Sequence, residues 1–454
     1  MSELLASLPR VDRVLAHPAL DEARARVGPA LKALVREVIE EARASVRGGG
    51  TPIDADEAAR RVATRASAWS ARRMARVINA TGVILHTNLG RAPLSRAAVD
   101  ALGDQGGGYV SLEIDLESGR RGGRASHAEN ALATLTGAEA ALVVNNNAAA
   151  VVLALAALAL GRSVVVSRGE LVEIGGGFRV PEVLARSGAK LVEVGTTNRT
   201  RTSDYARALD EVADVAAILR VHPGNFRQSG FVERPSLAEL VSLGRGRNVA
   251  VIEDLGGGSL VDLASFGLGA DPLVSSSVAA GVDLATFSTD KILGGPQGGV
   301  VLGKRAAVER ARRDPLARAL RMGRLPLAAL EATLAAHLSG EVDEIPALRM
   351  ARRPAHEVHA RARRWAARLG LSEDSILRVT AVAGGGTYAG DELPSWALSV
   401  RPRDPDAFAA ALRRGKPAVV ARIAEGAVLF DARTVMDDED DALVVAIDAA
   451  IRAT

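Results

Sequence analysis

The sequence predicts an α/β protein with three parts: an N-terminal helical domain at 1–75, a large α/β domain at 76–330 and a small C-terminal α/β domain at 331–454. Three observations lead to this prediction. Apolar residues recur at helical spacing near the N-terminus, β-rich runs then alternate with Ala-rich helical runs, and the alternation resumes after a long helix that opens near Leu330. A chain of 454 residues is also too long for one typical domain.

The N-terminal helical domain is predicted from the segment "PALKALVREVIEEARASVR". Its apolar residues follow the 3.6-residue period of a helix that packs one face: Leu31, Leu34, Val35, Val38 and Ile39. A glycine stop and an acidic helix start in "RGGGTPIDADEAARRVA" predict a second helix. Residues 1–76 hold fourteen Lys and Arg against ten Asp and Glu, which fits either a surface that contacts RNA or a merely solvated one.

The two α/β domains are predicted from short runs rich in Val, Ile and Leu. Several runs are apolar at consecutive positions, as expected for a parallel sheet buried on both faces. The strand candidates of the large domain are 140–145, 163–167, 190–195, 216–221, 249–254, 284–288 and 299–303. In the C-terminal domain the strand candidates are 395–401 and 418–431, with a helix between them at 405–414.

The composition and motifs exclude several kinds of chemistry. The chain has no cysteine, which removes disulfides, thiolate nucleophiles and Cys-ligated metal centres. His356 and His359 lack the i, i+4 spacing that places two ligands on one helix face, so no metal site is predicted. The sequence contains no P-loop motif, and its glycine runs do not have the spacing of a dinucleotide-binding fingerprint after a strand. The N-terminus has no signal-peptide core and the apolar run 148–160 is too short to cross a bilayer, so we expect a cytoplasmic protein without membrane contact.

A lysine and an aspartate stand at the ends of two predicted strands. The chain has only five lysines, and Lys291 lies in "FSTDKILGGPQGG", directly after the strand 284–288. Asp254 ends the strand 249–254, at the edge where ligands gather in open α/β sheets. A lysine that forms a Schiff base and an aspartate that pairs with a pyridinium nitrogen are the two protein groups that pyridoxal phosphate needs. Taken singly, each residue could also be an ordinary turn lysine or strand-end aspartate.

A phosphate-binding helix start is predicted in "ALVVNNNAAAVVLAL". Asn145, Asn146 and Asn147 follow a strand and precede an Ala-rich helix, whose first N–H groups could hold a phosphate. Simple capping of the helix is the alternative. Ser288 and Thr289 could add hydroxyl groups to the same phosphate.

Several long motifs, in this order, carry a resemblance to a known family: "INATGVILHTNLGRAPLS", "SLEIDLESGRRGGR", "VNNNAAA", "SRGELVEIGGGFRVPEV", "VGTTNRT", "DLGGGSLVDL" and "FSTDKILGGPQGG". Together they closely resemble the bacterial L-seryl-tRNA(Sec) selenium transferases, also called selenocysteine synthases. The resemblance covers nearly the whole chain. It implies the aminotransferase-like fold of the fold-type I pyridoxal phosphate enzymes, and conversion of seryl-tRNA(Sec) to selenocysteyl-tRNA(Sec) through a dehydroalanyl intermediate.

The resemblance also implies roles for individual residues. Lys291 would carry pyridoxal phosphate, Asp254 would pair with its ring nitrogen, and Asp290 stands beside the lysine as in the family. The family's anion-binding arginines fall on Arg91, Arg318 and Arg321, which would hold selenophosphate, the selenium donor. The N-terminal domain would bind the tRNA. The subunits would form a homo-oligomer, a ring of dimers that we expect to be a decamer.

Two alternatives stay open. The first is a pyridoxal phosphate lyase acting on a small amino acid or amino sugar phosphate, for which the basic N-terminal helices have no evident use. The second is a non-catalytic tRNA-binding protein that keeps an inactive cofactor fold, although the presence of Lys291 and Asp254 argues against it. The chain departs from the family at Thr387 and Tyr388, where serine and proline are expected, a difference expected to affect only local loop contacts.

Overall fold

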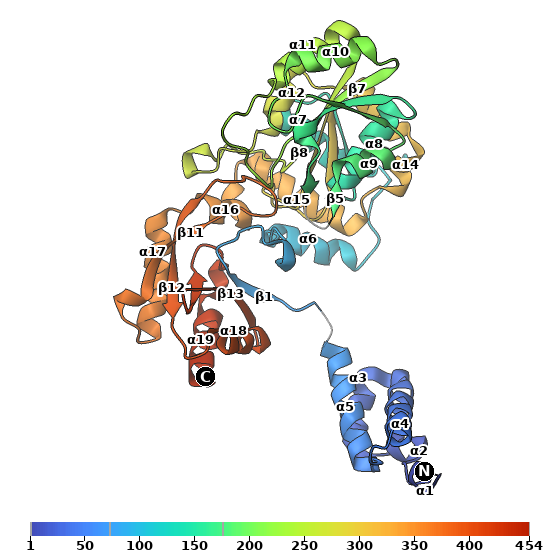
Figure 1. The fold of residues 1–454 in the computed structure, drawn as a ribbon, viewed down its shortest axis with the longest axis vertical. Helices are drawn as coiled ribbons and strands as arrows, with labels where there is room; N and C mark the ends of the chain where they lie inside the picture. The colour runs from blue at the N-terminus through green and yellow to red at the C-terminus, as the bar shows by residue number, and fades with distance from the viewer. Residues whose placement is uncertain (1, 72–73, 175–176, 454) are drawn as a thin grey trace. The chain divides into compact units, whose positions relative to one another are not determined.

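The structure, a computed structural model, describes residues 2–71, 74–174 and 177–453. Gly175 and Gly176 of the motif "SRGELVEIGGGFRVPEV" lie outside the described residues. The chain forms two compact units, Met1–Arg76 and Val77–Thr454. Figure 1 shows the first unit as helices and the second as sheets with helices around them.

The first unit is a small helical bundle. Its helices are α1 (Ser2–Ala6), α2 (Val11–Leu15), α3 (Asp21–Val27), α4 (Leu31–Arg47) and α5 (Ala55–Ala71). The apolar side of α4 packs against α5, and Leu31, Val35, Val38 and Ile39 are buried as predicted, whereas Leu34 is half-buried. The Asp54 carboxylate accepts a hydrogen bond from the backbone N–H of Glu57 at 2.8 Å, which starts α5 at the predicted acidic turn.

The second unit is built around a seven-stranded sheet of order β2-β10-β9-β8-β7-β3-β6. The strands are β2 (Ala140–Val144), β3 (Ser163–Ser167), β6 (Lys190–Val194), β7 (Val215–Val221), β8 (Ala250–Gly256), β9 (Leu284–Ser288) and β10 (Gly299–Gly303). Each predicted run of the large domain is one of these strands. Neighbouring strands from β9 to β6 are parallel, whereas β10 is antiparallel to both β2 and β9. The sequence pattern did not indicate this reversed strand.

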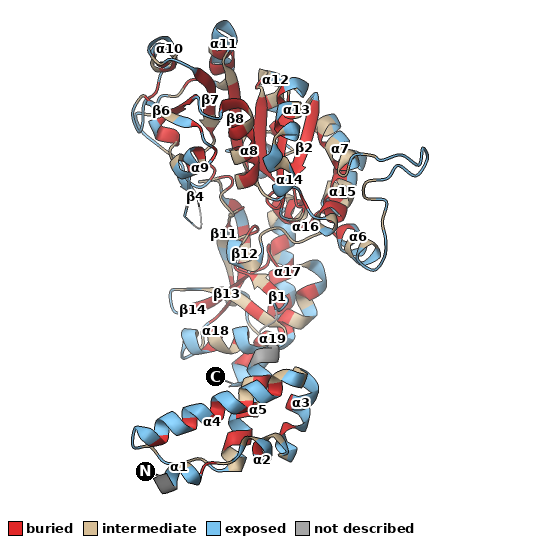
Figure 2. Cartoon of the chain, turned by 90° about the vertical axis from the view of Figure 1, so that its right-hand side faces the viewer, coloured by how far each residue is buried: buried red, intermediate tan, exposed pale blue. Residues whose placement is uncertain are grey.

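Helices cover both faces of this sheet and bury its strands, apart from most of the edge strand β6 (Figure 2). One face packs against α8 (Asn147–Ala159), α9 (Val180–Arg186) and α13 (Arg305–Arg313). The other packs against α7 (Ser126–Thr136), α10 (Thr202–Glu211), α11 (Leu237–Arg247), α12 (Val274–Ala280) and α15 (Arg324–Ser339). The apolar run expected to be too short for a membrane is α8, whose side chains lie in the first of these cores. Among the described residues, no helix combines the length and hydropathy of a membrane span.

A second sheet, of order β1-β13-β14-β12-β11, forms the C-terminal part. Its strands are β1 (Val77–Ala80), β11 (Ile376–Ala381), β12 (Leu393–Val400), β13 (Ala418–Ala424) and β14 (Ala427–Asp431). The helices α17 (Ala355–Arg368), α18 (Pro405–Arg414) and α19 (Asp440–Ala453) share its apolar core. The predicted run 418–431 is a hairpin of two strands, and the predicted helix 405–414 is α18.

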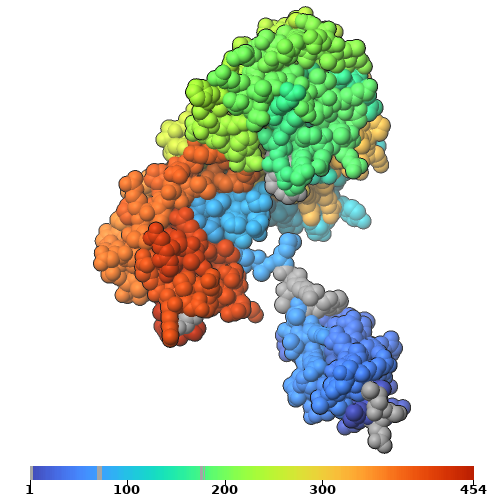
Figure 3. Space-filling model, viewed as in Figure 1, coloured from blue at the N-terminus to red at the C-terminus, as the bar shows by residue number. Residues whose placement is uncertain are grey.

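The first strand of the second unit joins this C-terminal sheet, because β1 pairs with β13 in parallel. In Figure 3 the blue atoms that follow residue 77 accordingly lie against the orange and red atoms of the C-terminal part. The expected boundary between residues 330 and 331 falls inside α15, a helix that packs against α6 (Arg96–Gly106) and α7. The division of this unit into two domains at that point stays a prediction.

The remaining elements are short. They are the helices α14 (Pro315–Ala319) and α16 (Pro346–Arg352), the two-stranded pair β4 (Glu173–Ile174) and β5 (Phe178–Arg179), and the 3₁₀ turns Pro18–Leu20, Gly28–Ala30, Thr87–Leu89, Arg168–Glu170, Ala264–Phe266, Val342–Glu344, Glu373–Ser375 and Asp437–Glu439.

Candidate active site

Four strands that run in the same direction end at one edge of the large sheet. A polar residue lies at or just after the end of each of them. Asn147 comes after β2, His222 after β7, and Lys291 after β9, while Asp254 lies near the end of β8. The carboxyl ends of parallel strands meet at one edge, which is where open α/β sheets bind their ligands. This edge is therefore the candidate active site.

Lys291 is buried, with 5% of its surface exposed. Its Nζ donates a hydrogen bond to the carbonyl oxygen of Gly386 at 3.3 Å. Burial lowers the pKa of the Lys291 amine, because desolvation penalises the ammonium form, and the nearby Arg91 guanidinium lowers it further. Three aspartates act in the opposite direction: Asp254, Asp290 and Asp271. The net effect favours the neutral amine, which is the nucleophilic form.

Asp254 is buried and is held by neutral donors. Its Oδ1 accepts from Asn147 Nδ2 at 2.8 Å, from Thr286 Oγ1 at 3.1 Å and from the backbone N–H of Gly256 at 3.2 Å. Burial raises the pKa of the Asp254 carboxyl, and these hydrogen bonds oppose that rise. Within the described ranges, no Lys or Arg makes an ion pair with it. A buried carboxylate with only neutral donors fits a cationic ring nitrogen, as pyridoxal phosphate would supply.

The three asparagines have three different roles. The Asn146 side chain accepts from the backbone N–H of Ala149 at 2.8 Å and so caps α8. Asn147 instead turns to Asp254, and its buried Oδ1 has no hydrogen-bond partner among the described residues. Asn145 is exposed, and its backbone N–H donates to the carbonyl of Leu320 at 2.8 Å. The unsatisfied Asn147 oxygen, beside Asp254, is a further sign that this edge can receive a polar ligand.

Ser288 and Thr289 are both buried. Ser288 pairs with Gly299 in the ladder between β9 and β10. The Thr289 hydroxyl donates to the carbonyl oxygen of Pro296 at 2.5 Å, so its proton is already used. A phosphate needs donors, and the expected contribution of the Thr289 hydroxyl therefore does not fit this arrangement.

Asp290 and Arg91 form an ion pair beside Lys291. Arg91 Nη1 lies 2.7 Å from Asp290 Oδ2, with 34% of the arginine side chain and 10% of the aspartate side chain exposed. Arg91 adopts a positive φ of 64°, unusual for a residue other than glycine. Arg91 and Asp290 are 199 positions apart in the chain, and the fold brings the "NLGRAPLS" motif to the lysine.

Arg318 and Arg321 lie farther from this cluster. Arg318 is exposed on α14, and Arg321 is exposed with its Nη1 3.5 Å from Glu113 Oε1. The backbone of Arg321 forms a bridge with Val144, the last residue of β2, so its segment does reach the active-site edge. In the part of the chain that the structure describes, neither guanidinium contacts Lys291.

Two features of the site were missed in the sequence. His222 could have been found, because it follows a strand just as Lys291 does. Asp271 carries no such signal; it joins the site only because its Oδ1 lies 2.9 Å from His222 Nε2. The loop with Thr387 and Tyr388 was expected to make only local contacts, but the neighbouring Gly386 carbonyl holds the Lys291 amine. Among the described residues, no group of three His, Asp or Glu side chains is arranged as a metal site.

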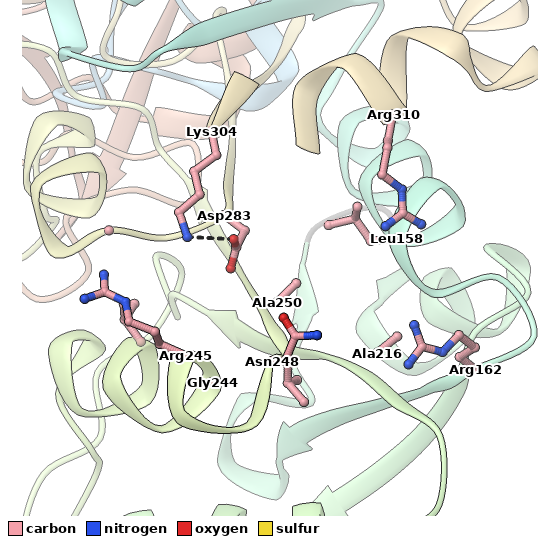
Figure 4. A pocket seen from close by; sticks show the side chains of 13 residues that line it. Leu158, Arg162, Ala216, Gly244, Arg245, Asn248, Ala250, Asp283, Lys304 and Arg310 are labelled. Carbon is pink, nitrogen blue, oxygen red and sulfur yellow. Dashed lines mark hydrogen bonds and ion pairs between the residues drawn. The ribbon is translucent and has the colours of Figure 1, made fainter. Parts of the chain in front are cut away.

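A basic cavity of about 380 Å³ lies at the opposite edge of the sheet, where the parallel strands begin (Figure 4). Three of its four cations have partners: Lys304 pairs with Asp283 at 2.8 Å, Arg162 pairs with Asp214 at 2.6 Å, and Arg310 donates to a carbonyl of α8, whereas the Arg245 side chain has no partner among the described residues. Cations near helix C-termini stabilise those ends. This cavity is therefore separate from the Lys291 site.

Comparison with known proteins agrees with the motifs. Residues 77–436 match the family model described as L-seryl-tRNA selenium transferase, and residues 5–43 match the one described as selenocysteine synthase N terminal. The chain is 46% identical to the L-seryl-tRNA(Sec) selenium transferase of Moorella thermoacetica, over 99% of this chain and 98% of that protein. It is 44% identical to the protein of that name from Geobacter sulfurreducens, over 98% of each.

A solved structure shows the same fold. D-Glucosaminate-6-phosphate ammonia-lyase is similar with a TM-score of 0.60 and 20% identity, over 84% of this chain and 96% of that one. The prediction of an aminotransferase-like, fold-type I large domain is confirmed. With its motifs, its strand-end lysine and aspartate and its full-length relatives, the chain belongs to the L-seryl-tRNA selenium transferase family.

Proposed function

We propose that this protein uses pyridoxal phosphate to convert seryl-tRNA(Sec) to selenocysteyl-tRNA(Sec), with selenophosphate as the selenium donor, in the cytoplasm. The observation that carries the proposal is the buried pair Lys291 and Asp254 at neighbouring strand ends of a chain with full-length relatives of that name. The relatives supply the reaction, and the site supplies groups that can perform it.

The residues around Lys291 fit the cofactor. When bound, pyridoxal phosphate supplies an electron sink that acidifies the Cα–H of an attached amino acid. Lys291 would hold it, and the lysine amine, once displaced by the serine amino group, would take the Cα proton. Asp254 would hold the ring nitrogen in its protonated form, with Asn147 fixing the carboxylate. Asn146 orders the start of α8, near which the phosphate group would lie.

Arginines would bind the selenium donor. Selenophosphate is a small polyanion, and a guanidinium presents a fork of donors that matches its oxygens. Arg91 spends one nitrogen on Asp290 and keeps other N–H groups for a ligand. Arg318 and Arg321 are exposed on the segment that reaches the end of β2, and we assign them to the same donor.

The first unit would bind the tRNA. The exposed side of α4 carries Lys32, Arg36, Arg43 and Arg47, a row of cations suited to a phosphate backbone. Such contacts position a large substrate without reading its bases. A small-molecule lyase has no evident need for this unit.

A homo-oligomer, a ring of dimers and specifically a decamer, would complete the sites. The loop between α6 and α7 extends away from the body of the second unit (Figure 2), and on it Tyr109 and Leu116 are exposed to 108% and 77%. Large apolar side chains on an extended loop favour contact with another subunit. Arg318 and Arg321, which lie apart from Lys291 in one subunit, could then serve a shared site.

The test is a reconstituted reaction. Purified protein with pyridoxal phosphate and selenophosphate is given seryl-tRNA(Sec) or seryl-tRNA(Ser), and selenocysteyl-tRNA is measured. Product from the selenocysteine tRNA alone is expected. A cofactor-loaded protein that makes no product and does not distinguish the two tRNAs would overturn the proposal and favour a small-molecule lyase. Lys291→Ala should lose both the visible absorption of the bound cofactor and all turnover.

A further inference from the structure

A histidine–aspartate pair, His222 and Asp271, borders the Lys291 site and is used by none of the steps above. His222 follows β7, and its backbone N–H donates to the carbonyl of Asp254 at 2.8 Å. Its ring Nε2 lies 2.9 Å from Asp271 Oδ1. The Asp271 side chain is only 4% exposed, and its other oxygen, Oδ2, is buried without a hydrogen-bond partner among the described residues.

An unsatisfied buried carboxylate oxygen requires an explanation. Leaving such an acceptor unpaired destabilises the folded state, and more so when the group is charged, so folding alone would not select it. The chain also keeps room for it: a side-chain carbon on Gly257 would lie 2.8 Å from Asp271 Oδ2. This is a physical reason for the middle glycine of "DLGGGSL". The oxygen is therefore preserved, and a donor should reach it during function.

Lys291 is the donor that lies against the same segments. A side-chain carbon on Gly256 would lie 3.8 Å from Lys291 Nζ, and the Gly386 carbonyl accepts from Nζ at 3.3 Å. The space at Gly257 is bounded both by Asp271 Oδ2 and by Thr387, whose Cγ2 lies 3.2 Å from that same carbon position. Thus the amine lies near Gly256 and Gly386, and the free oxygen lies near Gly257, the next residue of the same loop. A lysine side chain can move between them because it has four flexible methylene groups.

We propose that Asp271, held in place by His222, is a positioning residue that accepts a hydrogen bond from the ammonium group of Lys291 after the lysine has left the cofactor. The proton on that ammonium comes from the substrate Cα, and it passes to Lys291 Nζ with no change in oxidation state. Asp271 keeps the charged lysine beside the reacting carbon and within the site. The catalytic timing rests on the proposed function, whereas the pairing of the two residues does not.

The direction in which Asp271 changes the basicity of the Lys291 amine follows from the charged groups around these two residues. Lys291 faces Arg91, Asp254 and Asp290 as well as Asp271, and each carboxylate favours the ammonium form. On the other side, Asp271 faces His222 and the buried phenol of Tyr388, the pKa of which is raised to about 12, mainly by burial. The phenol therefore stays neutral at ordinary pH. Removing the Asp271 charge should make the Lys291 amine less basic.

The test measures the basicity of Lys291 in the full chain without cofactor. Acetylation of Lys291 by acetic anhydride is followed by peptide mass spectrometry as a function of pH, and each curve is scaled to its own high-pH plateau. In Asp271→Asn, whose amide keeps the shape of the side chain, the midpoint should fall by about one pH unit, a tenfold change in amine fraction. Asp262→Asn, which alters another aspartate of the same loop region, should leave it unchanged.

An unchanged midpoint in a folded Asp271→Asn protein would overturn the proposal. If that variant does not fold, His222→Phe provides the second test, because it removes the ring that holds Asp271 in place. Its midpoint should fall, and a midpoint that stays or rises would equally overturn the pairing. No tRNA or selenophosphate is used, so failure here is distinct from failure of the proposed reaction.

Discussion

Replacing Lys291 with methionine is expected to stabilise the cofactor-free protein while abolishing its function. The lysine amine is buried with one hydrogen bond of 3.3 Å, and burial lowers its pKa. The folded state therefore disfavours the ammonium that the unfolded chain carries freely. Methionine has nearly the same shape and no charge, so it fills the site without that cost. Active-site groups commonly reduce stability in this way.

The size of the expected gain in the free energy of unfolding follows from the incomplete hydrogen bonding of the buried Lys291 amine. Burial of an incompletely paired polar group costs about 1–3 kcal/mol, and each unit by which the lysine pKa is lowered corresponds to about 1.4 kcal/mol. The size of this penalty depends on pH. Because the folded pKa lies below the unfolded one, the penalty is complete below the folded pKa and is lost as the pH rises toward the unfolded value near 10.4. The advantage of the variant should shrink over the same range.

The assay is urea unfolding of Lys291→Met and of the unaltered protein, both without cofactor, at pH 7 and near pH 10. Lys304→Met is the matched control, because Lys304 is a partly exposed lysine paired with Asp283 at 2.8 Å and should lose no more than about 1 kcal/mol. A Lys291→Met protein that is less stable at pH 7, or whose advantage is equal at both pH values, would refute the reasoning.

Three further outcomes are expected. Gly258→Ala should lower the free energy of unfolding, measured by urea titration, by about 1–3 kcal/mol, because φ is +73° and the new carbon would lie 2.4 Å from a phenylalanine ring, whereas Gly246→Ala in the open side of α11 should not. Arg91→Gln should raise KM for selenophosphate about tenfold, seen in initial rates, with tRNA affinity kept. Lys32→Glu with Arg36→Glu should weaken tRNA binding and reduce the salt slope by about 1–2, while cofactor absorption is unchanged.

Much of the large sheet could be predicted because its signal is local. Every strand of that sheet except the edge strand β6 is buried along nearly its whole length, because helices cover both faces, and its consecutive apolar residues were therefore visible in the sequence. Lys291 and Asp254 were predictable for a related reason. Asp254 lies near the end of β8 and Lys291 follows β9, and parallel strands present their carboxyl ends at one edge.

The partners of these residues could not be predicted in the same way. Asn147 donates to Asp254, which lies 107 positions away, and Arg91 pairs with Asp290 at a separation of 199. Such pairs depend on the order of strands in the sheet. The antiparallel insertion of β10 between β2 and β9 decides how far β2 lies from β9, and no pattern within one strand encodes it.

The sequence by itself determined the α/β class, the strands of the large sheet, the cofactor lysine and aspartate as candidates, and the family through its ordered motifs. Only the tertiary structure decided that β1 joins the C-terminal sheet, that the Gly386 loop meets Lys291, and that Asp271 pairs with His222 and keeps one oxygen without a partner among the described residues. The physical reason is that periodicity reports which face of one element is buried, whereas a site is made by contacts between elements that are distant in the chain.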